Sequence, residues 1–471
     1  MVCYQEEVRD PSRMAEVLNR VIEKAFRGSA PAQINVPRDY WTQVIDIDLP
    51  PIVRFERQGG GKKAIDEAAK ILSNAKFPVI LSGAGVVIGN AIEDCKKLAE
   101  KLDAPVCNGY QHNDSFPGNH PLAVGPLGYN GSKAAMELIS KADVVLALGT
   151  RLNPFSTLPG YGIDYWPKNA TIIQVDMNPD RIGLTKKVTV GICGDAKLVS
   201  QQILEKLSSN AGDNGREDRK NLIHQTKSSW LQTLTSLDHE DDDPGTVWNK
   251  EARERDKERM SPRQAWRAIQ AGMPDDVIIS SDIGNNCAIG NAYPTFEKGR
   301  KYLAPGLFGP CGYGFPSILG AKIGCPDTPV IGFAGDGAFG ISMNEMSSCA
   351  RKEWPSITMV IFRNYQWGAE KRNSILWFDD NFVGTELDPE LSYAKVATAC
   401  GLKGVTVKTM EETTSAIKQS CLDQKKGITT FIEVILNQEL GEPFRRDAMK
   451  KPVKVAGINT KDMRPQILKN G

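Results

Sequence analysis

Residues 329–364 constrain the fold most strongly, because they predict two buried strands joined by a helix. Residues 329–334 and 357–362 are short apolar runs, which are typical of strands buried on both faces. Between them, Met343 and Met346 recur at helical spacing. A strand–helix–strand unit of this length places its two strands parallel to each other. The sequence therefore predicts an α/β fold built from doubly wound parallel sheets.

A polar residue follows each of these two strands. Asp336 lies in the tripeptide Gly335-Asp336-Gly337, and Asn364 follows 28 positions later (364 − 336). Open α/β sheets bind ligands at the carboxyl ends of their strands. A carboxylate, an amide oxygen and the main-chain carbonyl of Gln366 are oxygen ligands that suit a Mg²⁺ shared with a diphosphate. A lone aspartate would more often cap a helix, but the second polar residue after the next strand favours a metal–diphosphate site.

This stretch resembles the signature of thiamine-diphosphate enzymes of the acetolactate synthase and pyruvate decarboxylase superfamily. Within that superfamily, residues 108–117, 282–286 and 363–373 are most similar to the sulfoacetaldehyde acetyltransferase family. The resemblance extends to about residue 440. The superfamily usually has two consecutive asparagines where this chain has Arg363 and Asn364. Only the second position is a metal ligand, so we expect the metal site to be retained.

The resemblance implies that the C-terminal part of the chain binds thiamine diphosphate through glycine-containing loops. Backbone and amide donors of residues 282–286 would hold the diphosphate, and the loop 306–316 would pack against the rings of the cofactor. In that loop a carbonyl at Gly309 would accept a hydrogen bond from the pyrimidine, and Cys311 would replace the larger apolar residue that holds the cofactor bent. The implied cofactor-binding residues are Gly284, Asn285, Asn286, Gly309, Cys311, Gly312, Gly335, Asp336, Gly337, Ala338 and Asn364, and the implied Mg²⁺ ligands are Asp336, Asn364 and Gln366.

The chain of 471 residues is too long for a single core and is expected to form several domains. The expected units are a remnant of an N-terminal pyrimidine-binding domain (1–45), a linker (46–60), a central α/β domain (61–207), a linker with a helix (208–260), a thiamine-diphosphate-binding domain (261–440) and a tail (441–471). The resemblance implies that an activating glutamate comes from the pyrimidine-binding module. No residue of this sequence matches it, so the catalytic residue stays unassigned.

Two features of the expected central domain allow more than one interpretation. The glycines at 83, 85 and 89 suggest a dinucleotide loop, but their spacing is GxGxxxG and no acidic residue ends the next strand. Asp176 follows a strand and is either a structural residue or a vestige of an FAD or ADP site. The polar segment 108–117 either caps the sheet or contacts substrate or cofactor at a subunit interface.

The amino-acid composition indicates which kinds of partner the protein can bind. The hydrophobic content of 41% and the net charge of +1 indicate a soluble globular protein that binds no nucleic acid. Its apolar runs are too short to span a membrane, and the N-terminus lacks the apolar core of a signal peptide. Ten cysteines without paired spacing indicate reduced thiols and a cytoplasmic location.

The resemblance implies an acyl transfer that converts 2-sulfoacetaldehyde and phosphate into acetyl phosphate and sulfite, in sulfonate (taurine) degradation. It also implies a homodimer or homotetramer. Both substrates are anions, and Lys371 or Arg372 either meets one of them or belongs to a solvated face. Two alternatives remain. An acetolactate synthase-like carboligase or decarboxylase would share every cofactor residue, and a cofactor-binding fragment without most of the N-terminal module would be catalytically silent.

Overall fold

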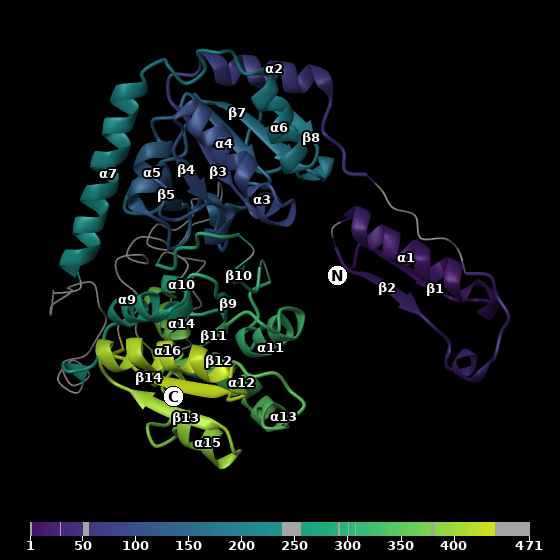
Figure 1. Cartoon of the computed structure of the whole chain (residues 1–471), viewed down its shortest axis with the longest axis vertical. Coiled ribbons are helices and arrows are strands. Elements are labelled where there is room, and N and C mark those ends of the chain that lie inside the picture. The colour runs from purple at the N-terminus through teal and green to yellow at the C-terminus, as the bar shows by residue number, and fades with distance from the viewer. Residues whose placement is uncertain are drawn as a thin grey trace, which may run out of the picture.

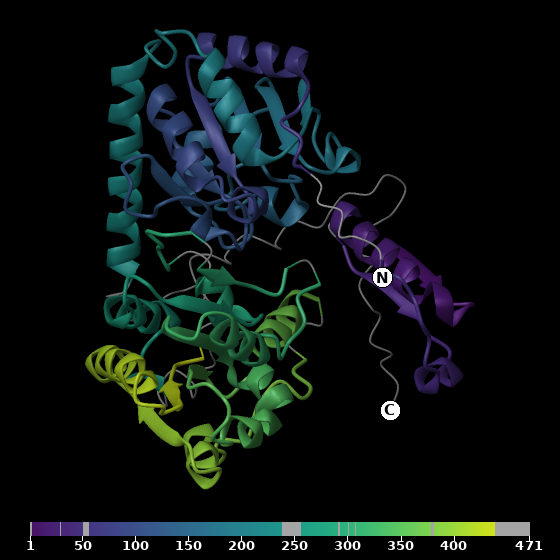
Figure 2. The ribbon, with the colours of Figure 1, turned by 45° about the vertical axis from the view of Figure 1, so that its right-hand side comes forward.

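The computed structural model describes residues 2–28, 30–49, 56–237, 256–290, 293–299, 301–306, 308–377 and 381–438. Two α/β domains lie one above the other, and a small N-terminal unit lies beside them (Figure 1). Helix α7 (Arg216–Leu237) runs along one side of the molecule from the central domain towards the C-terminal domain, as the turned view in Figure 2 also shows. The predicted tail (441–471) lies outside the described residues.

The N-terminal unit is a strand–helix–strand motif. It consists of β1 (Tyr4–Glu7), η1 (Pro11–Arg13), α1 (Met14–Gly28), β2 (Ala32–Asn35) and η2 (Arg38–Thr42), with the two strands parallel. The apolar spacing of residues 14–27 predicts an amphipathic helix and residues 32–37 predict a strand, and α1 and β2 confirm both. Strand β1 was not predicted, because its sequence, Tyr-Gln-Glu-Glu, carries little apolar character. The small core contains Val8, Val17 and Val21, whereas Phe26 of α1 is 81% exposed.

The central domain is built around a six-stranded parallel sheet in the order β5-β4-β3-β6-β7-β8. The chain starts at β3, moves outwards to β5 and then returns to β6, so the direction of winding switches between β3 and β6. Its elements are α2 (Lys62–Asn74), β3 (Pro78–Ser82), α3 (Ala84–Ile88), α4 (Ile92–Leu102), β4 (Val106–Asn108), η3 (Asn113–Ser115), β5 (Ala123–Pro126), α5 (Lys133–Ile139), β6 (Val144–Leu148), η4 (Pro154–Thr157), β7 (Thr171–Asp176), η5 (Pro179–Arg181), β8 (Val190–Cys193) and α6 (Ala196–Lys206).

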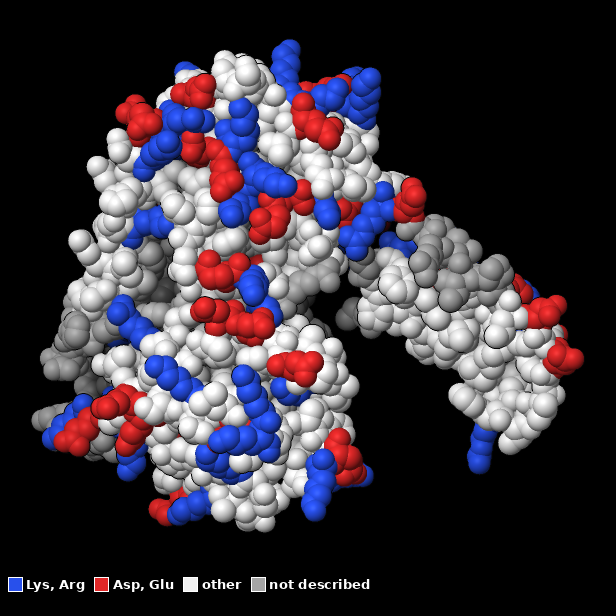
Figure 3. All heavy atoms as spheres, in the orientation of Figure 1, with Lys and Arg blue, Asp and Glu red and all other residues white. Residues whose placement is uncertain are grey.

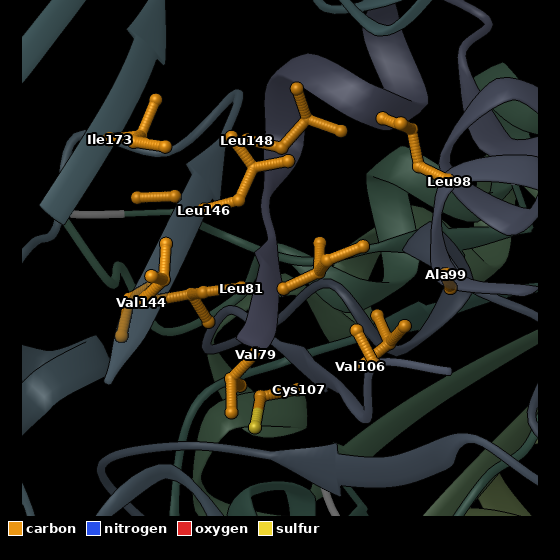
Figure 4. Packing of buried hydrophobic residues seen from close by; sticks show 14 of the residues in the cluster. Val79, Leu81, Leu98, Ala99, Val106, Cys107, Val144, Leu146, Leu148 and Ile173 are labelled. Carbon is orange, nitrogen blue, oxygen red and sulfur yellow. The ribbon is translucent and has the colours of Figure 1, made fainter. Parts of the chain in front are cut away.

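The core of the central domain explains why its strands are continuous apolar runs. Helices cover both faces of a parallel sheet, so side chains that point either way from a strand are buried. Figure 4 shows Leu81 of β3 and Leu146 of β6 together with Val106 of β4 and Leu98 of α4 in this core. All four are fully buried, and each such side chain contributes about 1.5–3 kcal/mol relative to an exposed one.

The C-terminal domain contains a second six-stranded parallel sheet in the order β10-β9-β11-β12-β14-β13. Strands β11 and β12 are parallel neighbours, which confirms the predicted strand–helix–strand unit. The predicted helix between them is divided into α12, η6 and α13. The elements are α9 (Pro262–Gly272), β9 (Ile278–Ser281), α10 (Asn285–Gly290), β10 (Tyr302–Leu303), α11 (Gly314–Gly324), β11 (Val330–Gly335), α12 (Asp336–Ser342), η6 (Met343–Glu345), α13 (Met346–Cys349), β12 (Thr358–Arg363), α14 (Gly368–Trp377), α15 (Tyr393–Ala399), β13 (Lys403–Val407), α16 (Met410–Gln424) and β14 (Thr430–Ile435).

The polar segment 108–117 and the residues after it join the two large domains. The carboxylate of Asp114 accepts hydrogen bonds from the main-chain N–H groups of Lys301 (3.0 Å) and Tyr302 (3.1 Å), at the edge strand β10. The N–H of Gly118 donates to the carbonyl of Phe296 at 3.0 Å. The segment therefore caps the exposed edge of the C-terminal sheet. Its contact with substrate or cofactor stays a prediction.

The described surface carries both signs of charge. In Figure 3, basic and acidic side chains alternate over the two large domains on the face that is shown. Across the described ranges, every helix is too short or too polar to be a membrane span. All ten cysteines are free.

Candidate active site

Three neighbouring strands of the C-terminal sheet carry the predicted site residues at their carboxyl ends. Asn285 follows β9, Asp336 follows β11 and Asn364 follows β12. From β9 the chain goes to β10 on one side, while β11 pairs with β9 on its other side. The winding therefore switches between β9 and β11, which is where open α/β sheets form a ligand crevice.

Asp336 is held in a buried position by donors from the neighbouring strand and its own loop. Its Oδ1 accepts the N–H of Gly337 at 3.0 Å, and its Oδ2 accepts the N–H of Tyr365 at 2.7 Å. Nη1 of Arg363 also donates to Oδ2, at 3.1 Å. Burial raises the pKa of Asp336 to about 6, although the charge of Arg363 acts to lower it. A carboxylate in such a dry place is a suitable ligand for a cation.

The two other predicted metal ligands lie on the loop that follows β12. Asn364 is 2% exposed. Gln366 forms an antiparallel bridge with Glu386, in which Trp367 N–H donates to the carbonyl of Thr385 at 2.8 Å. In a bridge of this kind the N–H and C=O of the bridging residue face away from the partner segment. The carbonyl of Gln366 is therefore not used by the bridge and stays available as a ligand.

Unpaired buried amides indicate that this crevice is built for a polar ligand. Within the described part of the chain, Oδ1 and Nδ2 of Asn285 and Oδ1 of Asn286 are buried without a hydrogen-bond partner. Leaving such a group unpaired costs about 1–3 kcal/mol. A Cβ atom on Gly368 would lie 3.0 Å from Nδ2 of Asn285, so this amide borders the loop after β12. Around Gly335, by contrast, a Cβ atom would meet no atom of the described residues within 4 Å. These residues fit a diphosphate and its cation.

Comparison with known proteins agrees with this geometry. Residues 65–206 match the thiamine pyrophosphate enzyme central domain, and residues 282–434 match the thiamine pyrophosphate enzyme C-terminal TPP binding domain. The chain is 78% identical over 466 residues to a probable sulfoacetaldehyde acetyltransferase of Rhizobium meliloti (strain 1021), which covers 99% of this chain and 79% of the relative. It is 73% identical to the sulfoacetaldehyde acetyltransferase of Roseovarius nubinhibens, over 99% of this chain and 77% of the relative.

The chain belongs to the sulfoacetaldehyde acetyltransferase family of thiamine pyrophosphate enzymes. Its fold is also that of the crystal structure of benzoylformate decarboxylase from Polynucleobacter necessarius, with a TM-score of 0.70 at 20% identity. That likeness covers 93% of this chain and 76% of the decarboxylase chain, and it extends to the fold alone. The family resemblance and the α/β fold expected from the sequence are thus confirmed.

In this member of the family, Asp282 joins two of the predicted cofactor loops, a role that the sequence analysis missed. Its carboxylate accepts the N–H groups of Ile283 (2.8 Å), Gly312 (3.1 Å) and Gly314 (2.7 Å). Burial raises the pKa of Asp282 despite these hydrogen bonds. The available signal was an aspartate directly after a buried strand, at the start of a loop. Asp282 therefore ties the loop after β9 to the glycine-rich loop before α11.

The glycine-rich loop lies beside the helix that follows β11. A Cβ atom on Gly312, whose φ is +85°, would lie 3.2 Å from Cγ2 of Ile341. Gly309 is also in the left-handed region, with a φ of +61°. The structure therefore brings residues 284–286, 309–312, 335–338 and 364–366 to one end of the sheet. Cys311 lies on this loop and is exposed, and its contact with the cofactor stays a prediction.

The central sheet also changes its direction of winding, between β3 and β6. There, in contrast to the C-terminal sheet, main-chain atoms fill the crevice. A Cβ atom on Gly83 would lie 2.6 Å from the carbonyl oxygen of Gly149, and one on Gly85 would lie 2.6 Å from the Cα of Gly149. The N–H of Gly85 donates to that carbonyl at 2.8 Å. These glycines allow close packing between the start of α3 and the residue that follows β6. Asp176 accepts the N–H of Asn178 at 2.8 Å, which is a structural role for its carboxylate.

Two charged residues near the site have partners that the sequence did not reveal. Arg363 stands at a position that is not expected to be a metal ligand, and it contacts Asp336 directly. Lys371 was considered as an anion-binding residue or part of a solvated face. Its side chain is 12% exposed and forms an ion pair with Glu386 at 2.5 Å. Among the described residues, no group of three or more His, Cys, Asp or Glu forms a metal site. The candidate site instead combines one carboxylate with neutral oxygens.

Proposed function

We propose that this chain transfers the acetyl group formed from 2-sulfoacetaldehyde to phosphate, and releases sulfite, with bound thiamine diphosphate and Mg²⁺. Sulfonate degradation of the taurine type would use this reaction. The observation that carries the proposal is the 78% and 73% identity, over 99% of this chain, to relatives that bear this enzyme name. The unpaired amides of Asn285 and Asn286 support it, because they lie where a diphosphate would pair them.

The residues after β11 and β12 would hold the cation. We assign the ligands as the carboxylate of Asp336, the amide oxygen of Asn364 and the main-chain carbonyl of Gln366. Mg²⁺ prefers octahedral coordination. These three protein oxygens, of which only the carboxylate carries charge, leave the other coordination positions for diphosphate oxygens and water. Mg²⁺ at this place anchors the diphosphate and does not activate water.

The chain also supplies a dry and shaped environment. When bound, thiamine diphosphate supplies the nucleophilic carbon and the electron sink that the loss of sulfite requires. Asn285, Asp336 and Asn364 are each at least 95% buried, so the anchoring groups act with little competition from water. The ring of Trp367 lies within 2.8 Å of the position of a Cβ on Gly337, so glycine at 337 allows this close approach. We expect Gly309 and Cys311 to contact the rings of the cofactor.

We further propose that the enzyme works as a homodimer or homotetramer in the cytoplasm. Apolar side chains at the edge of the candidate site support self-association. Phe308 is 86% exposed and Ile341 is 58% exposed, and Ile341 lies against Gly312 of the cofactor loop. Exposed apolar residues that gather at one place often mark a protein interface.

The test is an assay of sulfite and acetyl phosphate with the purified chain. It contains 2-sulfoacetaldehyde, phosphate, thiamine diphosphate and Mg²⁺, and each component is omitted in turn. We expect equal amounts of sulfite and acetyl phosphate, and no product without phosphate or either cofactor component. Binding of thiamine diphosphate is measured in parallel by calorimetry.

The two alternatives predict different results in the same experiment. Formation of acetolactate or loss of CO₂ from pyruvate, without sulfite release, would assign the chain to the carboligases or decarboxylases. No turnover, with Mg²⁺-dependent binding of thiamine diphosphate that is weak or absent, would identify a catalytically silent chain. Either result would overturn the proposed acetyl transfer while leaving the fold and family intact.

A further inference from the structure

We propose that Arg363 is a positioning residue of the metal site, which orients the Asp336 carboxylate so that Oδ1 faces the cation. The inference rests on the proposed Mg²⁺ site and goes beyond it, because Arg363 is not itself a ligand. Arg363 is the last residue of β12 and is fully buried. It stands where the superfamily usually has an asparagine, so this device distinguishes the present chain from that pattern.

The hydrogen bonds of Asp336 are unequal between its two oxygens. Oδ2 accepts two donors, Nη1 of Arg363 at 3.1 Å and the N–H of Tyr365 at 2.7 Å. Among the described residues, Oδ1 accepts only the N–H of the next residue, Gly337, at 3.0 Å. A carboxylate oxygen has two lone pairs directed in its plane. Oδ2 is therefore saturated, whereas Oδ1 keeps a lone pair for a cation.

The guanidinium of Arg363 is itself fixed from several sides. Nη2 donates to the carbonyls of Asp388 and, at 3.0 Å, Leu391. Its central carbon lies 4.3 Å from the centre of the Tyr365 ring. These contacts leave it little freedom to follow a rotation of the carboxylate. A lysine could not make them all, because its ammonium is a single point on a flexible stem.

The same network reaches the main chain of Asp336 and the next strand. The hydroxyl of Tyr393 donates to the main-chain carbonyl of Asp336 at 2.8 Å, and the ring centre of Tyr393 lies 5.5 Å from the guanidinium carbon of Arg363. Glu433 of β14 lies 3.8 Å from Nε of Arg363, and its own carboxylate accepts the N–H of Tyr393 at 3.1 Å. The carboxylate and the arginine are thus both attached to the rigid sheet.

The arginine has two opposing effects on a cation bound at Asp336, and this allows a decisive test. Its positive charge repels the cation, so a purely electrostatic role predicts tighter metal binding when the charge is removed. Its orientation of the carboxylate predicts weaker binding. We infer that orientation dominates, because the carboxylate would otherwise be held at Oδ2 by the N–H of Tyr365 alone.

The experiment measures the affinity for Mn²⁺, a paramagnetic stand-in for Mg²⁺, with the full chain and a fixed concentration of thiamine diphosphate. Free Mn²⁺ is followed by electron paramagnetic resonance, and the unfolding temperature is recorded for every variant. We expect Arg363→Met to weaken Mn²⁺ binding by about 10- to 100-fold, as loss of a residue that orients a ligand typically does. Arg363→Lys keeps the repelling charge and loses the planar fork that orients the carboxylate, so it should also weaken Mn²⁺ binding.

Arg219 offers a matched control in the central domain. It is 1% exposed, and its guanidinium donates to five main-chain carbonyls, including those of Lys76 at 2.7 Å and Asp103 at 2.9 Å. Arg219→Met should lower the unfolding temperature and leave the affinity for Mn²⁺ unchanged. The control separates the loss of a buried arginine from the loss of this one contact.

Each possible result of the Mn²⁺ measurement either supports or contradicts the proposed role of Arg363. Unchanged or tighter Mn²⁺ binding by folded Arg363→Met would overturn it and leave the metal site standing. Should Arg363→Met fail to fold, Arg363→Lys decides, and unchanged affinity would overturn the inference. If the wild-type chain binds no Mn²⁺, the inference fails together with the assigned metal site. The sulfite assay then shows separately whether the proposed reaction also fails.

Discussion

The two large sheets of this chain are both parallel and doubly wound. They differ in structure at the switch point, where the direction of winding changes. In the central sheet, Gly83 and Gly85 at the start of α3 pack directly against the main chain of Gly149, the residue after β6. In the C-terminal sheet, the corresponding place carries the buried side chains of Asn285 and Asp336, and Gly335 has open space beside it. The same topology thus supports a sealed crevice in one domain and an open one in the other.

The comparison shows what a glycine-rich strand end can mean. Both sheets place glycines and an aspartate after their strands, and sequence patterns of this kind are easily interpreted as ligand loops. In the central sheet Asp176 accepts the N–H of Asn178, and the glycines pack against main chain. In the C-terminal sheet the aspartate Asp336 is also paired, but Oδ1 and Nδ2 of Asn285 and Oδ1 of Asn286 lack partners within the described residues. At these two switch points, unpaired buried amides therefore distinguish the candidate site from a packed turn better than glycine spacing does.

The largest effect is expected when the strand-end aspartates are exchanged for asparagine. Asp336→Asn removes the only carboxylate among the assigned metal ligands, so Mg²⁺-dependent binding of thiamine diphosphate should weaken by more than about 100-fold, or about 2.7 kcal/mol. Asp176→Asn keeps a side-chain oxygen for Asn178 and should leave cofactor affinity unchanged. Calorimetric titration of both variants measures the difference. Equal affinities would contradict the assignment of the site to the C-terminal sheet.

A glycine pair gives a smaller effect and tests whether each crevice is closed or open. In Gly85→Ala the new Cβ would lie 2.6 Å from the Cα of Gly149, so the free energy of unfolding should fall by about 1–3 kcal/mol. Gly335→Ala adds its methyl group to open space and should change stability by less than about 0.5 kcal/mol.

For cofactor affinity, the same two glycine positions are expected to differ in the opposite sense. A methyl group at position 335 would occupy room that we assign to the diphosphate, so affinity for thiamine diphosphate should fall by about tenfold. Denaturant unfolding without cofactor and titration with it measure the two properties. A destabilised Gly335→Ala, or one that binds as well as wild type, would show that this space is not the diphosphate site.

The last comparison concerns two buried asparagines that differ in their partners, and its smallest effect is expected for Asn285. Nδ2 of Asn108, in the central sheet, donates to Oγ of Ser115 at 2.9 Å, so Asn108→Leu should lose about 1–3 kcal/mol of stability. Asn285 has no partner to lose among the described residues, so Asn285→Leu should leave the stability of the cofactor-free chain unchanged or raise it by about 1 kcal/mol. It should also weaken cofactor binding. Thermal unfolding with and without thiamine diphosphate provides both measurements, and a destabilised cofactor-free Asn285→Leu would mean that the amide is already paired.

Local sequence signals located most elements but not all of their boundaries. The continuous apolar run at residues 144–148 predicts a buried strand, and β6 has these bounds. The pattern of residues 396–402 predicts a helix, but the helix observed there, α15, spans Tyr393–Ala399, because Ser392 caps its start and Gly401 adopts a φ of +81° just beyond its end. Strand β13 (Lys403–Val407) was not predicted, since an edge strand with exposed positions lacks the apolar run of a buried one.

The sequence by itself determined the parallel α/β units, the positions of Asp336 and Asn364 at strand ends, and the family, because strand and helix periods and a spaced motif are local properties of the chain. Only the tertiary structure decided which crevice is sealed, that Asp282 joins two loops, and that Arg363 contacts Asp336. These are contacts between residues on different strands and loops. Their existence depends on strand order and register, which the pattern of any single segment does not encode.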